Sequence, residues 1–134
     1  MDLIDRLKKH GIQPSAQRVA VARYVLQTDE HPTADLVWQR VRPYLPVLSR
    51  ATVYNTLNLF VRKGLLRAMA ISEGSIVFDP KVEPHHHFIE DGSGKIHDIP
   101  WDAVQTRPLD KLAGFEVREY QVVMRGKKLP ARGR

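Results

Sequence analysis

The sequence of 134 residues contains no cysteine. Disulfide bonds, thiolate zinc sites and cysteine nucleophiles are therefore excluded. It also lacks any apolar stretch approaching the roughly 20 residues that a membrane-spanning helix needs. The first segment, MDLIDRLKKHG, is amphipathic and includes acidic side chains, unlike the apolar core of a secretory signal. We expect a cytoplasmic protein that makes no contact with a membrane.

Basic residues outnumber acidic ones, and the surplus is unevenly distributed. Residues 1–80 hold 11 Lys and Arg against 7 Asp and Glu, whereas residues 81–124 hold 5 against 8. A basic first half beside a mildly acidic second half is typical of a polyanion-binding domain joined to another domain. The last ten residues hold 5 basic residues and no acidic one, and we interpret residues 127–134 as a disordered basic tail.

Helix signals dominate the first half of the chain. Four residues that suit a helix N-cap precede stretches in which apolar residues keep helical spacing: Asp2, Ser15, Thr33 and Ser49. Pro46 prevents the third helix from continuing past Leu45, and Gly64 ends the fourth. In the third helix we expect four side chains to face inward, namely Leu36, Val37, Val41 and Tyr44.

The fourth predicted helix combines an apolar stripe with a polar face. Val53, Leu57, Phe60 and Val61 fall on one side, while Arg50, Tyr54 and Asn58 share another. Guanidinium, phenol and carboxamide groups can read base edges and hold phosphates. A helix, a turn and a polar-faced helix match the helix-turn-helix pattern, and the segments LLRAMAIS and SIVFD supply a two-stranded wing. The alternative is an ordinary helical bundle with a polar surface. Our candidate DNA-binding residues are Arg18, Arg50, Thr52, Tyr54 and Asn55.

Potential metal ligands gather around three consecutive histidines. On a strand, His85 and His87 share a face while His86 points away. A hairpin through the turn DGSG returns Asp98 to the start of that strand, and Asp79 precedes it by only a few residues. Two imidazoles and two carboxylates suit Fe(II), Mn(II) or Zn(II). For His86, His10 and His97 we expect structural roles.

The second half of the chain is expected to be a small sheet. Two prolines within five residues mark a hinge at residues 81–84. After the hairpin, we expect a short helix over residues 100–112 and a strand over residues 115–125. About 45 residues of this kind bury little apolar area alone. We therefore expect a homodimer formed through residues 85–126, which would present two reading helices to a two-fold DNA site.

Six motifs follow one another in order along residues 5–128: GIQPSAQRVAV, HPTAD, SRATVYNTLNLFVRKGLL, the FD of residues 78–79, HHHF and GKIHDI. Together they resemble the ferric uptake regulator family of bacterial metal-dependent transcription factors. The resemblance implies an α+β fold, with an N-terminal winged-helix DNA-binding domain at residues 1–80 and a small α/β dimerisation domain. It also implies a regulatory metal between these domains, whose binding closes the dimer into its DNA-binding shape.

By position, the resemblance places the regulatory metal ligands at His31, Asp79, His85, His87 and Asp98. His31 enters only through the resemblance, because by itself it is a loop residue ahead of a helix cap. A ligand from the DNA-binding half makes mechanistic sense, since it lets the metal couple the two domains.

Two further metal sites of the family are missing from this sequence. Glu90 and Ser93 stand where the first of two Cys-x-x-Cys pairs would hold a structural zinc. Pro84, Gln105 and Tyr120 stand where ligands of an additional site are expected. The resemblance thus implies one Fe(II) or Mn(II) ion per subunit, with Zn(II) able to bind in vitro, and no structural zinc held by four cysteines.

Two cysteine-free groups within the family fit the chain. Asp98 and Asn55 favour the peroxide-responsive repressors, whereas HHHF and the DIP of residues 98–100 favour the iron-response regulators, which sense iron availability or haem. We predict a peroxide-sensing repressor that binds double-stranded DNA at an A·T-rich inverted repeat. A metal site that serves folding alone is one alternative. A non-haem iron enzyme is another, but it conflicts with a chain whose first half is helical and basic, so we expect no enzymatic activity.

Overall fold

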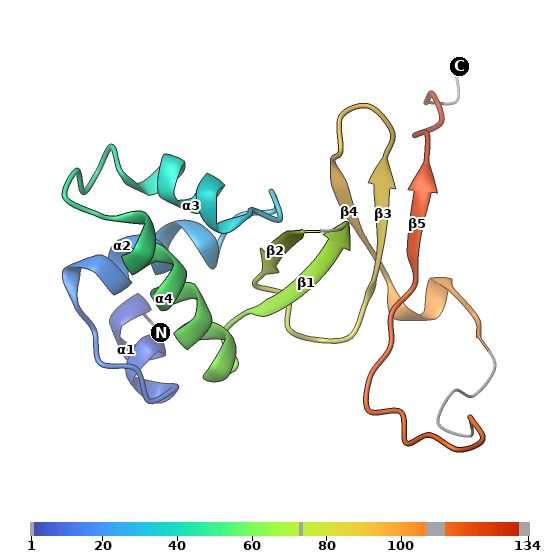
Figure 1. Ribbon diagram of the computed structural model, residues 1–134, viewed down its shortest axis with the longest axis horizontal. Coiled ribbons are helices and arrows are strands. Elements are labelled where there is room, and N and C mark those ends of the chain that lie inside the picture. Colours follow the sequence, from blue (N-terminus) through green and yellow to red (C-terminus); the bar gives the residue numbers. More distant parts are fainter. Residues whose placement is uncertain (1, 73, 107–111, 132–134) are drawn as a thin grey trace. The chain divides into compact units, whose positions relative to one another are not determined.

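The computed structural model describes residues 2–72, 74–106 and 112–131, and the chain divides into two compact units, Met1–Val82 and Glu83–Arg134 (Figure 1). The first unit contains four helices and a two-stranded sheet, and the second a three-stranded sheet, so the α+β class is confirmed. No helix among the described residues is long and apolar enough to cross a membrane. The helices are α1 (Leu3–Lys9), α2 (Ala16–Val25), α3 (Ala34–Val41) and α4 (Arg50–Arg62).

Each of the four helices begins where its predicted cap stands. The side-chain oxygen of the cap accepts a hydrogen bond from the backbone N–H three residues later, which satisfies one of the free donors at a helix start. The pairs are Asp2 with Asp5, Ser15 with Arg18, Thr33 with Leu36, and Ser49 with Thr52.

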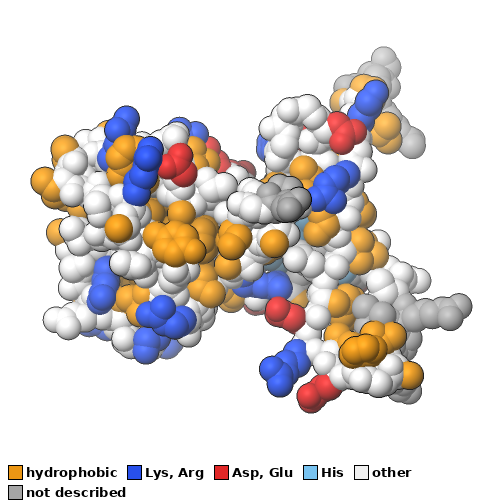
Figure 2. Space-filling view, in the orientation of Figure 1, with side chains coloured by type: hydrophobic (Ala, Val, Ile, Leu, Met, Phe, Trp, Pro, Cys, Tyr) orange, Lys and Arg blue, Asp and Glu red, His pale blue; other side chains and the backbone are white. Residues whose placement is uncertain are grey.

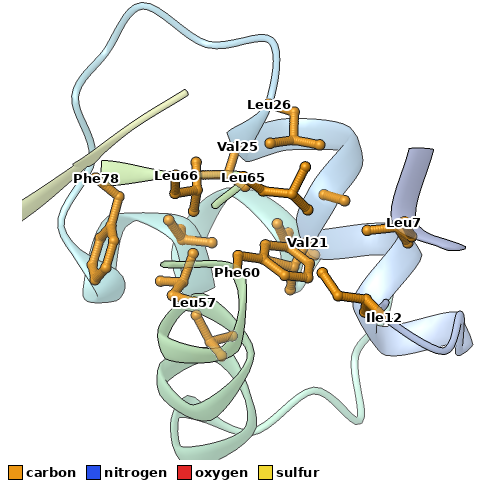
Figure 3. Close-up of a cluster of buried hydrophobic side chains, with 14 of the residues drawn as sticks. Leu7, Ile12, Val21, Val25, Leu26, Leu57, Phe60, Leu65, Leu66 and Phe78 are labelled. Carbon is orange, nitrogen blue, oxygen red and sulfur yellow. The ribbon is translucent and has the colours of Figure 1, made fainter. Parts of the chain in front are cut away.

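The core of the first unit lies where the helices meet (Figure 3). Leu57 and Phe60 of α4 are fully buried and pack with Val21 and Val25 of α2. Phe78, from the second strand of the wing, joins the same cluster. The predicted apolar stripe thus fixes which side of α4 faces inward and leaves its polar side at the surface.

The prediction that Tyr44 faces inward is wrong, because its side chain is 86% exposed. Helix α3 ends at Val41, and a turn follows in which the N–H of Tyr44 donates to the carbonyl of Val41. Pro43 explains this early end, because proline supplies no N–H and disfavours a helical conformation in the residue before it. The helical spacing therefore stops before Tyr44, and Leu48 is buried instead.

The wing follows α4 as two antiparallel strands, β1 (Arg67–Ser72) and β2 (Ser75–Asp79), as predicted. Their register pairs Arg67 with Asp79 at the end away from the turn. The N–H of Phe78 donates to the carbonyl of Pro32 at 2.9 Å. This bond fixes the end of β2 beside the loop that contains His31.

The second unit has the strand order β4-β3-β5, from β3 (His86–Glu90), β4 (Ile96–Ile99) and β5 (Val123–Gly126). The predicted hairpin is present, with β3 and β4 antiparallel and His87 paired with Asp98. Strand β5 runs parallel to β3.

Two elements of the second unit are shorter than predicted. The expected helix at residues 100–112 is reduced to a 3-10 turn, η1 (Trp101–Ala103), and Val104 is extended; residues 107–111 lie outside the described part. Pro108 is incompatible with the interior of such a helix. The strand expected at residues 115–125 begins only at Val123. Strand β3 is short, and its pairing with β5 already starts at His87, opposite Val123, which leaves little of β3 for residues 115–122 to pair with. Residues 127–131 are exposed and carry no helix or strand.

The hairpin is closed by contacts among its own residues. The side chains of Glu90 and His97 form a hydrogen bond across the two strands, which lowers the pKa of Glu90. The N–H of Glu90 also donates to the carbonyl of Lys95 at 2.9 Å. Ile89 and Ile96 are buried nearby. These contacts hold the turn at the place where the resemblance would put thiolates.

We predict that removing metal leaves the protein folded and dimeric. Far-ultraviolet circular dichroism and sedimentation should be the same for chelator-treated and Mn(II)-loaded protein, with a higher melting temperature for the loaded form because only the native state binds the ion well. Conversion of the chelated protein to an unfolded monomer would instead reveal a structural metal.

Candidate metal centre and nucleic-acid interface

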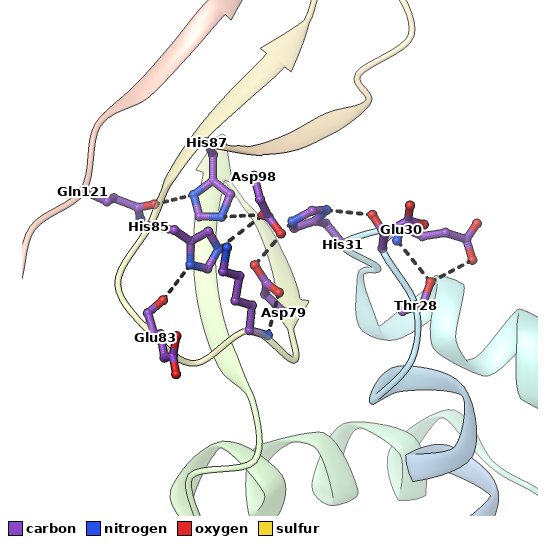
Figure 4. Close-up of polar contacts among 11 residues, drawn as sticks. Thr28, Glu30, His31, Asp79, Glu83, His85, His87, Asp98 and Gln121 are labelled. Atoms are coloured by element: carbon purple, nitrogen blue, oxygen red, sulfur yellow. Dashed lines mark hydrogen bonds and ion pairs between the residues drawn. The ribbon is translucent and has the colours of Figure 1, made fainter. Parts of the chain in front are cut away.

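Three of the predicted ligands are histidines whose Nδ1 atoms face oxygen atoms (Figure 4). An oxygen of this kind only accepts hydrogen bonds, so Nδ1 carries the proton and donates in each ring. In the neutral ring, Nε2 then holds the lone pair, which is the form that binds a metal. The three donor–acceptor pairs are His31 with the carbonyl of Asp29 at 2.9 Å, His85 with the carbonyl of Glu83 at 2.7 Å, and His87 with Oε1 of Gln121 at 2.8 Å.

One part of the predicted ligand set lies within the first unit. Nε2 of His31 is 3.3 Å from Oδ2 of Asp79, and both side chains are buried. The other oxygen of Asp79 accepts a hydrogen bond from the backbone N–H of Lys81 at 2.9 Å. The carboxylate is therefore oriented with one oxygen toward the imidazole.

His31 has a strained backbone, with a φ of 50° that L-residues rarely adopt. Such a conformation costs of order 1–3 kcal/mol and persists only where neighbouring contacts impose it. Glu30 provides those contacts. It accepts hydrogen bonds from Arg40 of α3 at 2.8 Å and from Tyr24 of α2 at 2.7 Å, which together lower the pKa of Glu30 to about 2. The His31 loop is thereby anchored to two helices.

The other part lies within the second unit, on the β3–β4 hairpin. Nε2 of His85 is 3.2 Å and Nε2 of His87 is 3.5 Å from the same oxygen, Oδ1 of Asp98. The two rings meet edge to face, with their centroids 4.5 Å apart. Both histidines are buried, whereas the side chain of Asp98 is 31% exposed. The structure thus brings these three predicted ligands together.

Each group offers donor atoms that suit a divalent cation. A neutral Nε2 and a carboxylate oxygen are both acceptors, so they repel at these distances unless a proton or a cation lies between them. Ligands of one ion with bonds of about 2.0–2.1 Å are roughly 3.0–3.4 Å apart, close to the separations observed in His85–Asp98 and His31–Asp79. Imidazole with carboxylate suits Fe(II), Mn(II) or Zn(II).

His86 differs from its two neighbours in the direction of its ring. Its Nδ1 accepts a hydrogen bond from the backbone N–H of Val122 at 2.9 Å. The ring stacks on Trp101 with centroids 4.5 Å apart and planes 13° apart. Three consecutive histidines therefore do not form one ligand set. His86 packs on the other face of β3, which agrees with the structural role that alternation predicts.

The residues that orient the ligands were not identified from sequence patterns. Gln121 holds His87 from a position 34 residues away, and Glu30 acts through side chains of α2 and α3. Neither residue stands in a ligand-like pattern, and neither contact is local. No signal in a single sequence marks them.

The predicted DNA-binding residues lie on the exposed side of the first unit. Tyr54 is 53% exposed, and Arg50 and Asn55 are also exposed. Figure 2 shows Lys and Arg side chains at several places on the visible face of this unit, with few acidic ones among them. A polar groove of about 520 Å³ lies between the start of α2 and α4, lined in part by Arg18, Thr52, Asn55 and Arg62.

Thr52 has a local role in addition to lining this groove. Its hydroxyl lies 2.9 Å from Oγ of Ser49, and its N–H donates to the same oxygen. Arg18 donates to the carbonyl of Gln13 at 2.9 Å. Arg62 was not among the predicted DNA-binding residues, although it stands on α4 and faces the same groove.

Comparison with known proteins identifies the family. The ferric uptake regulator family pattern matches residues 9–125. The peroxide-responsive repressor PerR of Staphylococcus aureus is 32% identical over 127 residues, which cover 92% of this chain and 84% of that protein. The fold is similar to that of the Vibrio cholerae ferric uptake regulator, with a TM-score of 0.76 and 21% identity over 95% of this chain and 100% of that one. The Campylobacter jejuni peroxide stress regulator gives a TM-score of 0.66 and 26% identity, over 98% and 100%. The chain belongs to the ferric uptake regulator family.

Proposed function

We propose that the protein is a metal-dependent DNA-binding transcriptional repressor with one regulatory Fe(II) or Mn(II) ion per subunit. The observation that supports this most is the orientation of His31, His85 and His87, each of which donates from Nδ1 to an oxygen and directs Nε2 toward a carboxylate. Oxygen acceptors at Nδ1 are the usual hydrogen-bond partners of histidines that bind metals. The names of relatives such as the S. aureus repressor support the same function.

In this proposal a single ion joins the two groups of ligands. His31 and Asp79 come from the first unit, and the other three ligands from the second. Alone, each group supplies two or three donors, fewer than the coordination that Fe(II) and Mn(II) prefer. Together they supply five nitrogen and oxygen donors, which leave one position of an octahedron open. An ion that needs both groups selects one arrangement of the units, and in a homodimer it thereby sets the spacing of the two α4 helices.

We predict that His87→Ala abolishes metal-stimulated operator binding. Changing a residue that only hydrogen-bonds to a ligand typically lowers metal affinity by about 10–100-fold, so loss of the ligand itself should exceed that range. Isothermal titration with Mn(II) and fluorescence anisotropy on operator DNA measure the two effects. His10→Ala is the control, because the side chain of His10 donates from Nδ1 to the carbonyl of Arg6 in its own helix turn. If metal stimulates operator binding by the His87→Ala variant as strongly as by the parent protein, the site is not regulatory.

We predict that Tyr54 contacts DNA bases and that Arg50 contacts the phosphate backbone of the DNA. Asn55 suits adenine and Tyr54 can pack on a thymine methyl, which favours an A·T-rich inverted repeat. Tyr54→Ala should weaken specific binding by about 1–3 kcal/mol, whereas Arg50→Ala should weaken all sequences alike and flatten the salt dependence. Tyr44→Ala is a matched control on the same unit. If Tyr54→Ala lowers the binding free energy equally for operator DNA and for random-sequence DNA, Tyr54 does not contribute to base recognition.

The proposed signal is hydrogen peroxide. Fe(II) bound at this site would promote cleavage of the O–O bond, and the imidazole would supply the two electrons that the reaction consumes overall. The net step inserts one oxygen atom of peroxide into an imidazole C–H bond, and the other oxygen atom leaves as water. The oxidising species is short-lived and reacts with the nearest groups, so His31 and His85 are the expected targets. Oxidising either ring weakens a ligand, releases one unit from the other and lowers DNA affinity.

We predict that brief peroxide exposure of the Fe(II) form adds about 16 Da, one oxygen atom, to peptides containing His31 or His85. The Mn(II) form should resist, because Mn(II) does not readily cleave peroxide. Asp98→Glu should reduce the yield, because the longer side chain obstructs the open position. Mass spectrometry measures the oxidation of each peptide, and an operator-binding assay on the same samples measures the loss of DNA affinity. Oxidation confined to Met69 or Met124, with operator binding intact, would favour a regulator that responds to iron availability or haem.

A further inference from the structure

Two guanidinium groups share one indole ring at the surface of the first unit. Cζ of Arg42 lies 4.5 Å and Cζ of Arg50 lies 4.3 Å from the ring centroid of Trp38. The indole N–H donates to the carbonyl of Leu48 at 2.9 Å, which fixes the orientation of the ring. Arg42 is the residue that caps the end of α3, and Arg50 is the first residue of α4. We call these three side chains the Arg–Trp–Arg stack.

The charge of the stack is only partly compensated. Nε of Arg50 lies 3.1 Å from Oδ1 of Asp35, in a pair that is more than half exposed. Such exposed pairs are weak. Within the part of the chain that the structure describes, no carboxylate pairs with Arg42. Two like charges beside one ring repel each other, and a bound anion would relieve that repulsion.

The geometry of the stack leaves donors available for such an anion. A guanidinium that lies over an aromatic ring keeps its N–H groups in its own plane, where they can donate to phosphate oxygens. The first turn of α4 contains no acidic residue, so the positive end of this helix adds to the local field. A shallow depression of about 390 Å³ beside Arg50 continues to Tyr54 and Asn55.

We infer that the Arg–Trp–Arg stack binds phosphate groups of a duplex DNA backbone, and that Trp38 positions both guanidinium groups for this contact. The inference rests on the proposed function for the identity of the polyanion. Arg42 and Arg50 are exposed, and Arg50 lies at the start of the polar face of α4, so a long polymer can touch the stack and that face together. Arg42 and Trp38 become backbone-binding and positioning residues that act alike on every base sequence.

Salt dependence of binding to a random-sequence duplex tests this inference without requiring an operator or a metal. The slope of log K against log salt is negative, and each lost phosphate contact should decrease its magnitude by about 0.9. We expect that decrease for Arg42→Gln and at least as much for Trp38→Leu, which releases both guanidinium groups. Trp38→Phe should have a smaller effect than Trp38→Leu, because a benzene ring retains the cation–π contact but loses the hydrogen bond to Leu48. Arg23→Gln removes the same charge from the exposed side of α2 and serves as the control.

Equal slopes for Arg42→Gln and Arg23→Gln, or no duplex binding by the parent at low salt, would overturn the inference. If the magnitude of the slope for Trp38→Leu is no smaller than that for Arg23→Gln, the role of the indole is overturned. Arg42 is exposed, so its substitution tests the site even if a Trp38 variant fails to fold. A decreased slope in Arg42→Gln alongside operator binding that ignores metal would refute the proposed regulation and leave this site standing.

Discussion

A hydrogen bond from Nδ1 to an oxygen determines what each candidate ligand histidine can do. An imidazole without that bond can place its proton on either nitrogen, and one of its two neutral forms presents an N–H to an incoming cation. His31, His85 and His87 each have the bond, and each has a carboxylate oxygen 3.3, 3.2 and 3.5 Å from Nε2. His86 accepts at Nδ1 and so carries its proton on Nε2 when neutral. The same residue type thus has opposite chemistry at neighbouring positions.

The strained loop around His31 links this chemistry to the helices. Glu30 ties the loop to Tyr24 of α2 and Arg40 of α3, and α3 in turn packs against α4. A ligand on a freely moving loop could bind metal without moving the helices. In the proposed mechanism, a shift of His31 would act on α2 and α3 through the hydrogen bonds of Glu30.

Local interactions were predictable from the sequence, and interactions that depend on distant partners were not. His85, His87 and Asp98 converge through strand alternation and one hairpin, both of which act over a few residues. The strand predicted at residues 115–125 alternates in the right way, but extended chain becomes a strand only where a partner is available, and β3 accommodates only Val123–Gly126. The prediction for Tyr44 was wrong because it extended the helical spacing past Pro43. A proline disfavours a helical conformation in the residue before it, so this end of the helix could have been predicted from the local sequence. His31 entered through family resemblance alone, since the backbone strain and the contacts of Glu30 leave no periodic trace.

In the proposed function, one ion per subunit can act as a switch because contacts that give DNA affinity are separate from contacts that read the base sequence. Contacts of Arg42 and Arg50 with backbone would be the same in every arrangement of the two units, because the stack lies entirely within the first unit. In a dimer, however, the second α4 binds from a tethered position, and that advantage disappears when the geometry forbids both helices from binding together. Loss of the ion would then release DNA without changing any residue that touches it.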